Sequence, residues 1–407
     1  MGEMIMSHEP WDFLNSVLRF RDNDSQFWWD KTGRMFSKLL KYAGYSASEQ
    51  YRELNFYSLF VAPELGPSPD CHGNVRRWRS PGTPDSTPID FSWEWGHDNR
   101  AVIRYSFEPI GLHAGTDLDP LNRHATNDWI FKLQQQKMVP GLDLEWYGHF
   151  TQQILPHHGT RTKTVDRFVE ETTPKAGTVV ALDIEKSGPV MKVYIYPGLK
   201  AEELGITNLE LVERSIRSLP AEQFQSLNAE PLLRLGLSAG GDREVYVRAK
   251  HTTLDYMMDC ITLGGRLDMS GEAIEDLEDF WRVFLADAPD VLPGEAPGRA
   301  SPGFYYTLGC GRVISPKVYI SPSYFSRNDV DVLGRLRAFF ATRRTDSMMD
   351  NYEQALKDIF GSKTLESRCG SHYYVGCALH KGQLRVVTYL SPQSFDCEKD
   401  AIQDRQP

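Results

Sequence analysis

Apolar and polar residues alternate along ten short segments of the chain, and these segments occur as neighbouring couples. Alternation with a period of two is typical of a β-strand with one buried face, and the Gly, Asn, Asp and Pro residues inside each couple favour a tight turn. The pattern therefore predicts five antiparallel hairpins. Their strands are 88–95 with 101–108, 178–185 with 190–196, 232–238 with 243–249, 303–309 with 315–320, and 371–379 with 384–391.

Segments with apolar residues at helical spacing lie between the hairpins. One of them begins with Thr207 and Glu210, which have the spacing of a capping box. No low-complexity linker separates the repeated units, so we expect one closed sheet wrapped by helices. The proline-rich stretches 63–88 and 287–302 are expected to be loops over one end of it. The expected helices are 11–20, 25–43, 119–137, 143–155, 208–218, 272–285, 329–342 and 346–359.

The sequence KVYI occurs twice, at 192–195 and at 317–320. Side chains two residues apart on a strand point to the same face, so the lysine and tyrosine of each copy share one face and the valine and isoleucine share the other. The apolar face should meet the helices, which leaves the polar face to line the lumen. An exposed strand face is the alternative, and the recurrence of the pattern disfavours it. The lumen residues are then Lys192 and Tyr194, and Lys317 and Tyr319.

A lumen with lysine and tyrosine side chains predicts a particular kind of binding site. Lysine and arginine hold phosphate groups through charge-assisted hydrogen bonds, and the faces of tyrosine rings stabilise a cation by about 0.5 to 2 kcal/mol per contact. Arg104, in the strand AVIRYSF, adds a further positive charge. An anion beside a carbocation is what the ionisation of an allylic diphosphate produces, so such a compound is the candidate ligand.

Several longer motifs carry more specific information. They are RYSFEPIGLHAGTDLDPLN at 104–122, VAPELGP at 61–67, TPIDFSWEW at 87–95, ITLGGR at 261–266 and the two KVYI strands. With these motifs the chain closely resembles the fungal dimethylallyltryptophan synthase family of aromatic prenyltransferases. The resemblance implies an α+β fold, a ten-stranded antiparallel β-barrel built from αββα repeats and surrounded by helices. We expect a single domain over residues 1–407, with the helices of residues 1–60 packed outside and a short flexible tail at about 395–407.

The resemblance also implies an activity, which is metal-independent transfer of a prenyl group from an allylic diphosphate to an indole or another electron-rich aromatic acceptor. Arg104, Lys192 and Lys317 fall on positions that bind the diphosphate. Asp90 falls where the family usually has a glutamate that holds the indole N–H, and Glu94 on the same face is expected to replace or assist it as a catalytic residue. The tyrosines expected to surround the allyl cation are Tyr194, Tyr246, Tyr319, Tyr374 and Tyr389.

The third hairpin departs from the family pattern, because Asp242 and Glu244 stand where the family has two cations. A carboxylate about 4 Å from a phosphate costs on the order of 4 kcal/mol at an effective dielectric constant of about 20. Arg248 shares the parity of Tyr246 and is the expected compensating diphosphate ligand. Two alternatives therefore stay open: a cyclase that acts on an already prenylated aromatic compound without diphosphate, and a non-catalytic small-molecule binder.

The net charge and the composition limit the kinds of partner and the cellular compartment that are expected for this chain. The net charge of −10 disfavours nucleic acid and anionic membranes as partners. No basic leader with an apolar run, no stretch of about 18 apolar residues and no CxxC pair is present, so a cytoplasmic protein with reduced thiols is expected. Small molecules, an aromatic acceptor and the diphosphate, are the expected partners of a monomer or homodimer.

The acidic run EDLED at 275–279 mimics the aspartate-rich motif that holds magnesium in other prenyl-diphosphate enzymes. Ile274, Leu277, Trp281 and Phe284 form one apolar stripe, so the acids are expected to form a solvated helix face. No histidine has the spacing of a metal ligand, so no metal site and no cofactor besides the co-substrate is expected. The acceptor, the attacked atom and the prenyl length do not follow from the sequence.

Overall fold

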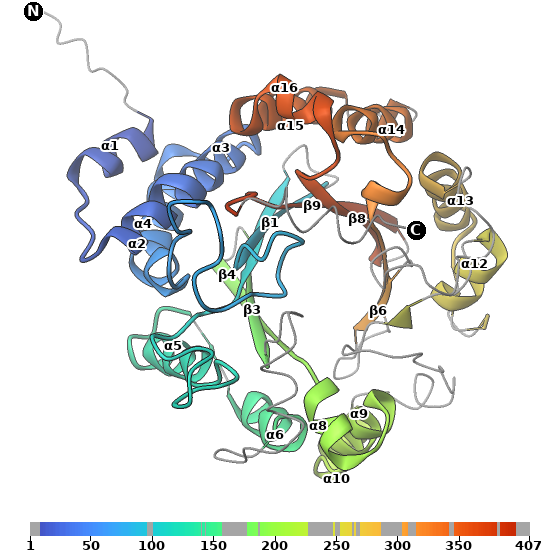
Figure 1. Cartoon of the computed structure of the whole chain (residues 1–407). Coiled ribbons are helices and arrows are strands. Elements are labelled where there is room, and N and C mark those ends of the chain that lie inside the picture. The colour runs from blue at the N-terminus through green and yellow to red at the C-terminus, as the bar shows by residue number, and fades with distance from the viewer. Residues whose placement is uncertain are drawn as a thin grey trace, which may run out of the picture.

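The computed structural model describes most of the chain as a curled sheet with helices around it (Figure 1). The described residues are 9–95, 101–139, 141–142, 144–156, 177–185, 188–226, 247–248, 253–262, 264–265, 269–285, 303–307, 315–341, 346–380 and 383–395.

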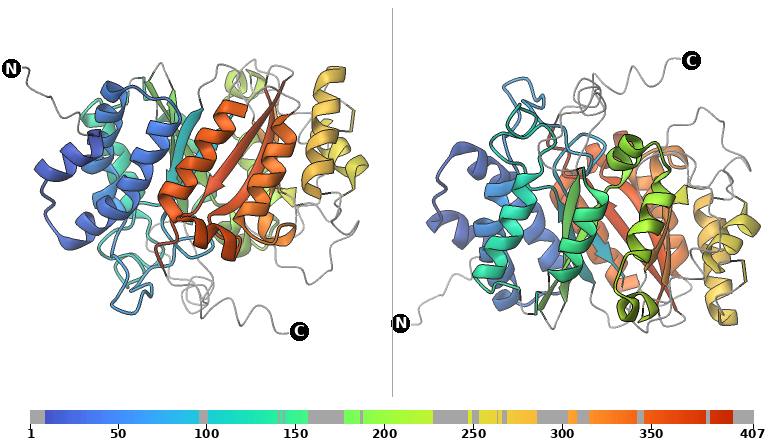
Figure 2. Two further views of the ribbon diagram at one scale, coloured as in Figure 1. Left: turned by 90° about the horizontal axis from the view of Figure 1, so that it is seen from above. Right: turned by 90° about the horizontal axis from the view of Figure 1, so that it is seen from below.

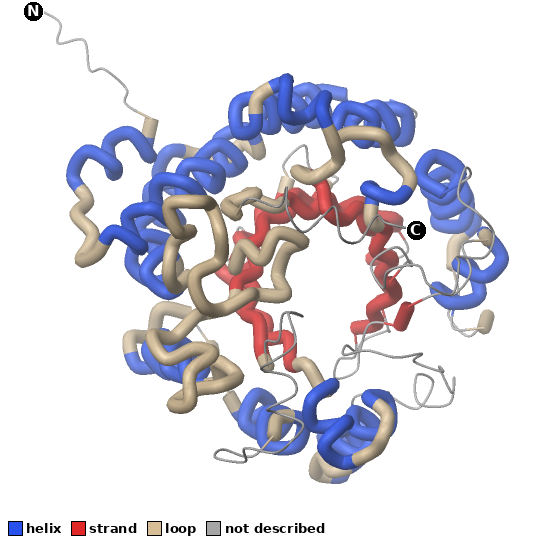
Figure 3. The backbone as a smooth tube through the Cα atoms, viewed as in Figure 1, coloured by secondary structure: helices blue, strands red, loops and turns tan. Residues whose placement is uncertain are grey.

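The described strands form one antiparallel sheet in the order β4-β3-β2-β1-β9-β8-β7-β6-β5. Strands that are consecutive in the chain are neighbours in the sheet, except that β1 also pairs with β9 and β4 does not pair with β5. Figure 3 shows the strands curled into an incomplete ring inside the helices. The strands are β1 (Ile89–Glu94), β2 (Val102–Phe107), β3 (Thr178–Glu185), β4 (Gly188–Ile195), β5 (Val247–Arg248), β6 (Gly303–Thr307), β7 (Ser315–Ile320), β8 (His372–His380) and β9 (Gln383–Leu390).

Four of the five predicted hairpins are confirmed as the antiparallel pairs β1–β2, β3–β4, β6–β7 and β8–β9. Of the third hairpin, only β5 is described, and it pairs with β6. The predicted strand at 232–238 lies outside the described residues. The curled antiparallel sheet is therefore established, and its closure by a tenth strand stays a prediction.

The sheet has an apolar outer face and a polar inner face. In β7, Val318 and Ile320 are buried, whereas Lys317 and Tyr319, which alternate with them, are partly exposed on the other side. In β2, the buried Tyr105 packs its ring against Phe36 of a covering helix. The orientation predicted for the second KVYI copy is confirmed, because the helices bury the outer face and leave the polar side chains to the inner one.

Helices cover the outer face of the sheet, as the views from above and below show (Figure 2). One hydrophobic core between helices and sheet runs from Leu14 to Phe395. The α-helices are α1 (Pro10–Val17), α2 (Asn23–Trp28), α3 (Arg34–Tyr42), α4 (Ala47–Phe60), α5 (His124–Gln135), α6 (Glu145–Ile154), α8 (Gly198–Leu204), α9 (Asn208–Arg217), α10 (Ala221–Ser226), α12 (Leu254–Thr262), α13 (Gly271–Leu285), α14 (Asp329–Ala341), α15 (Asp346–Phe360) and α16 (Ser362–Ser367).

Most predicted helices agree with the structure, and α9 has the predicted capping box of Thr207 and Glu210. Helix α5 starts five residues later than the predicted 119–137, because the Asp119 carboxylate accepts hydrogen bonds from the backbone N–H groups of Arg123 and His124 and so holds a turn there. Helix α4 was not among the predicted segments. Its buried side includes the polar residues Gln50 and Glu53, so the sequence does not show a continuous apolar stripe at helical spacing.

The predicted helix 25–43 is interrupted by a π-helical turn, η1 (Trp29–Gly33). The hydroxyl of Thr32 donates a hydrogen bond to the backbone oxygen of Trp28, and both neighbouring tryptophans are fully buried. A Cβ atom on Gly33 would lie 2.8 Å from the ring of Trp29. The wide turn therefore makes room for two consecutive tryptophans in the core.

A β-bulge interrupts β8. His372 pairs with Leu390 and Tyr374 with Tyr389, so Tyr373 is an extra residue on this strand. On the outer side, the Asp329 carboxylate of α14 accepts hydrogen bonds from the backbone N–H and from Nδ1 of His372, at 2.9 and 2.8 Å. The bulge is thus anchored to a helix.

Two loops lie over one end of the sheet, next to β1 and β2 (Figure 1). Glu108, directly after β2, accepts hydrogen bonds from Trp78 of the loop before β1 and from Asn122 of the loop after β2, both at 2.8 Å. Burial raises the pKa of Glu108 to about 7, although these hydrogen bonds lower it. The prediction for 63–88 agrees with this arrangement, and 287–302 lies outside the described residues.

Candidate active site

Two buried carboxylates hold Arg104 on the inner face of the sheet. Its Nη1 lies 2.5 Å from Oε2 of Glu94 on β1, and its Nε lies 3.1 Å from Oδ2 of Asp183 on β3. The antiparallel register brings them together, because β2 lies between these two strands and Arg104 is the direct partner of Asp183. Burial alone would lower the pKa of Arg104, but the two carboxylates hold it above its usual value. The guanidinium therefore stays charged.

Two lysines lie beside this arginine. Lys192 of β4 forms an ion pair with the same oxygen of Asp183. Lys317 of β7 comes from the far part of the sheet and interacts with the charges of both Arg104 and Lys192. Burial, and then the repulsion from these two cations, lowers the pKa of Lys317 to about 8. The inner face thus gathers cations from three separate strands.

The Glu94 carboxylate lies among these cations. Its second oxygen, Oε1, lies 3.0 Å from Nη1 of Arg385 on β9, so both carboxylate oxygens contact arginines. Burial would raise the pKa of Glu94, but Arg104, Lys317 and Arg385 lower it. Four cationic side chains therefore surround the two carboxylates of Glu94 and Asp183. We call them the cation cluster, and they are Arg104, Lys192, Lys317 and Arg385. The excess of positive charge suits a polyvalent anion.

A wall of tyrosine rings lies next to the cations on the same face. Tyr319 of β7 packs against Tyr374 and Tyr389, with ring centroids 6.0 and 5.4 Å apart. Tyr373 adds its ring at 4.9 Å from Tyr374 and 6.1 Å from Tyr389. Tyr194 of β4 interacts electrostatically with Tyr389, and Tyr389 with Arg104. Burial raises the pKa of Tyr389 above its usual value, so its hydroxyl stays neutral.

Gly376 of β8 allows the ring of Tyr319 to lie across its strand. The two residues are direct partners in the β7–β8 register. A Cβ atom on Gly376 would lie 2.7 Å from the backbone oxygen of Val318 and 3.4 Å from Cδ1 of Tyr319. A larger residue at this position would therefore displace either the β7 backbone or the tyrosine wall.

Asp90 lies away from the cation cluster, near the other end of β1. Its carboxylate accepts a hydrogen bond of 2.5 Å from the hydroxyl of Ser106, its direct partner on β2, and a second one from the hydroxyl of Tyr373. Burial raises the pKa of Asp90 to about 6, although these two hydrogen bonds lower it. At neutral pH the side chain is therefore mostly an ionised hydrogen-bond acceptor.

The structure brings together most of the residues singled out in the sequence, and the third hairpin is the exception. Tyr246, Asp242 and Glu244 lie outside the described residues. Arg248 is placed by its backbone in β5, opposite Gly303 of β6.

Sequence reasoning missed Asp183, Arg385, Ser106 and Tyr373. A signal exists for the first three. Asp183 is the only acid in the otherwise apolar run VVALDI, Ser106 shares the parity of Arg104, and Arg385 shares that of Tyr389. Parity predicts the wrong face for Tyr373, since only the bulge turns it inward.

No helix of the described residues is long and apolar enough to cross a membrane. The same residues include no group of three or more His, Cys, Asp or Glu side chains that could hold a metal ion. In α13, the residues of the EDLED run flank the buried Leu277, as the apolar stripe predicted.

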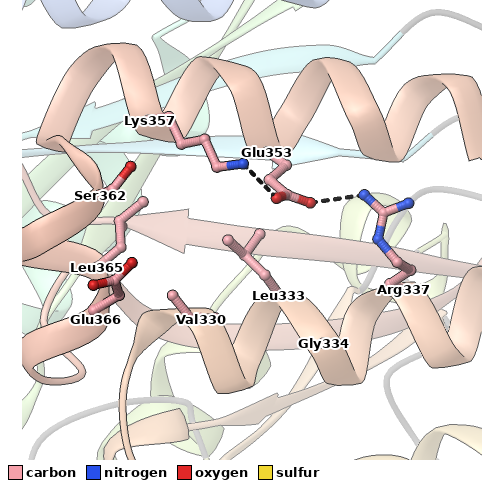
Figure 4. A pocket seen from close by; sticks show the side chains of 9 residues that line it. All are labelled: Val330, Leu333, Gly334, Arg337, Glu353, Lys357, Ser362, Leu365 and Glu366. Carbon is pink, nitrogen blue, oxygen red and sulfur yellow. Dashed lines mark hydrogen bonds and ion pairs between the residues drawn. The ribbon is translucent and has the colours of Figure 1, made fainter.

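A small pocket of about 290 Å³ lies on the outer surface between α14, α15 and α16 (Figure 4). Its charged residues are largely paired with one another, since Arg337 and Lys357 both contact Glu353 at 2.7 Å. The pocket contains none of the residues of the inner face.

Comparison with solved structures shows the same architecture. The structure of NotF in complex with brevianamide F and DMSPP matches this chain with a TM-score of 0.79, covering 96% of this chain and 100% of that one at 20% sequence identity. The curled antiparallel sheet with outer helices is thus the fold of the αββα prenyltransferases.

The sequence comparisons show the family. The family model for tryptophan dimethylallyltransferase matches residues 24–234 and 244–355. The 4-O-dimethylallyl-L-tyrosine synthase of Claviceps purpurea is 29% identical, over 91% of this chain and 88% of the relative. Tryptophan dimethylallyltransferase 1 of Epichloe coenophiala is also 29% identical, over 97% and 94%.

The chain therefore belongs to the tryptophan dimethylallyltransferase family, and it is a prenyltransferase. The resemblance seen in the motifs is confirmed. The comparisons do not favour the alternatives of a cyclase or a non-catalytic binder.

Proposed function

We propose that this enzyme transfers a prenyl group from an allylic diphosphate to an indole or another electron-rich aromatic acceptor of secondary metabolism, without a metal ion. The observation that carries the proposal is that the cation cluster and the tyrosine wall share one face of the sheet, with Tyr389 interacting with Arg104. The names of the two fungal relatives, a tryptophan and a tyrosine dimethylallyltransferase, support an aromatic acceptor.

In this proposal the diphosphate binds to Arg104, Lys192 and Lys317, with Arg248 as a further ligand. The bond between the allylic carbon and the diphosphate oxygen breaks, and both electrons stay on the oxygen. Cationic donors already aligned by Glu94 and Asp183 stabilise the departing anion without reorganising at the moment of reaction. The excess of positive charge supplies what a bound magnesium ion supplies elsewhere.

The allyl cation is held by the tyrosine wall until the acceptor attacks. Tyr194, Tyr319, Tyr374 and Tyr389 present ring faces that each stabilise a cation by about 0.5 to 2 kcal/mol, and Tyr246 is the fifth tyrosine that we assign to this role. Asp90 accepts a hydrogen bond from the N–H or O–H group of the acceptor and orients its ring. A pair of electrons from the acceptor forms the new bond to the allylic carbon. The attacked atom of the acceptor then loses its proton to Asp90, and this loss restores the aromaticity of the ring.

The proposal extends to the architecture around the site. We propose that residues 232–238 add a tenth strand between β4 and β5 and close the ring into a barrel that excludes water from the cation. A single domain over residues 1–407, a cytoplasmic location and a monomer or homodimer complete this view.

Mass spectrometry of reaction products tests the proposal. The enzyme is incubated with dimethylallyl, geranyl and farnesyl diphosphate and a mixture of indoles, phenols and polycyclic aromatics, in EDTA. The expected result is a product with the mass of one acceptor plus one prenyl group minus one hydrogen. Absence of any product would overturn the transferase proposal, and strict dependence on added magnesium would overturn its metal-free form. Calorimetry with dimethylallyl diphosphate separates a true donor site from a cyclase, because only the former binds it at micromolar concentration.

A further inference from the structure

The Asp90 carboxyl lies between two hydroxyl groups that come from opposite directions along the sheet. Ser106 reaches it from β2, the neighbouring strand on one side, at 2.5 Å. Tyr373 reaches it from β8, which lies beyond β9 on the other side. Asp90 is 6% exposed, so water screens these contacts very little.

The β-bulge in β8 lies at Tyr373, the residue that makes the second of these contacts with Asp90. His372 faces outward, where the Asp329 carboxylate accepts hydrogen bonds from its backbone and ring nitrogens. Tyr374 faces inward in the tyrosine wall. The extra residue between them, Tyr373, also turns inward and meets Asp90. Without the bulge, strict alternation would leave Tyr373 or Tyr374 on the helix side.

A carboxylate has about four lone-pair positions, and two donors occupy part of this capacity and leave the rest for a ligand. Both hydroxyls donate to Asp90, which favours its ionised, accepting form. We propose, on the basis of the proposed function, that Ser106 and Tyr373 are positioning residues that hold the Asp90 carboxylate for the N–H or O–H group of the aromatic acceptor. Their hydroxyl groups act through Asp90 and do not contribute to donor binding.

Variants at these two positions test the assignment. Tyr373→Phe and Ser106→Ala are each expected to raise the KM for the acceptor about tenfold, since each loses one hydrogen bond to a charged group. The KM for the prenyl diphosphate should stay within about twofold of the wild-type value, because the cation cluster is intact. The matched control is Tyr42→Phe, which removes a hydroxyl that donates to the Asp358 carboxylate at 2.6 Å on the outer helices.

The pH profile gives a second readout. Among the described residues, the groups that face Asp90 are Ser106, Tyr373 and Tyr389. Loss of either hydrogen bond disfavours the charged carboxylate, so the acidic limb of kcat/KM for the acceptor should move to higher pH in both variants and stay in place in Tyr42→Phe. An acceptor KM and an acidic limb that both match the wild type, or an equal rise in donor and acceptor KM, would overturn the positioning role.

Carboxyl titration by NMR, with ¹³C-labelled aspartate, separates this inference from the proposed function. If the wild-type enzyme makes no product, the proposed function fails, yet the titration still reports on the contact. A higher Asp90 pKa in Tyr373→Phe than in the wild type or in Tyr42→Phe supports the contact, and an unchanged one overturns it. If Tyr373→Phe fails to fold, Ser106→Ala provides the same comparison.

Discussion

Arg104 and Asp183 face each other across the β2–β3 strand pair, with Nε of the arginine 3.1 Å from Oδ2 of the aspartate. Lys192 of the next strand contacts the same carboxylate oxygen. One acid thus aligns two of the cations that we assign to the diphosphate. Removing an anion from such a buried cluster leaves positive charge without compensation. Substitution of the acids therefore tests the assignment of this site as well as substitution of the cations does.

Replacement of Asp183 by asparagine should lower the free energy of unfolding by about 2 to 3 kcal/mol, somewhat less than a fully buried pair, because Arg104 keeps Glu94. Inorganic pyrophosphate should then stabilise Asp183→Asn more than the wild type, since the ligand replaces the missing negative charge. Denaturant unfolding with and without pyrophosphate measures both effects. Asp128→Asn, at an exposed position on α5, is the control and should change stability by less than about 0.5 kcal/mol. Equal stabilisation of Asp183→Asn and wild type by pyrophosphate would contradict the assignment.

Lys317→Met should have opposite effects on two properties, because it should stabilise the free enzyme and weaken its binding of the prenyl donor. In the free enzyme, burial and the neighbouring cations disfavour the charged lysine, which lowers its pKa to about 8. A neutral side chain of similar length should therefore raise the free energy of unfolding at pH 7 by about 1 to 3 kcal/mol and abolish binding of dimethylallyl diphosphate in calorimetry. The exposed Lys363→Met should change neither. A destabilised Lys317→Met protein would show that the lysine is stabilising before the donor arrives.

The pKa of Lys317 also predicts a basic limit for catalysis. A lysine carries its charge below its pKa, so kcat/KM for the prenyl diphosphate should fall as the pH rises through about 8. The charge of Glu94 favours the protonated lysine, and Glu94→Gln should therefore move this fall to lower pH. Initial rates between about pH 6 and pH 9.5, with circular dichroism to check folding, measure the shift. A basic limb at the same pH in both proteins would argue against this interaction.

Gly376→Ala should disturb the tyrosine wall. The added Cβ atom would meet the backbone oxygen of Val318 at 2.7 Å, which neither strand can avoid without moving. We expect a loss of about 1 to 3 kcal/mol in stability and a lower kcat, measured by thermal unfolding and product formation. Gly148→Ala is the matched control, because nothing lies within 4 Å of its added Cβ in α6, and it should be neutral or stabilising by up to about 1 kcal/mol. Equal stability of the two variants would contradict the close approach of β7 and β8.

The sequence by itself determined the hairpins, the order of the helices around them and the face on which the lysines and tyrosines lie. Strand periodicity is a local property, so the alternation in KVYI is enough to separate Lys317 and Tyr319 from Val318 and Ile320. The family motifs added Asp90, whose position in TPIDFSWEW carries no chemical signal alone. Short helices such as α8 and α16 were missed, because two turns of helix are stable only when packed against the rest of the protein.

Only the tertiary structure decided which side chains meet. The pairing of Glu94 with Arg385, and of Asp183 with Arg104, depends on the register of strands far apart in the chain, β1 with β9 and β2 with β3. Local patterns do not encode this register. The inward turn of Tyr373 depends on a bulge fixed by a helix on one side and by Asp90 on the other, so no periodicity in the sequence could have predicted it.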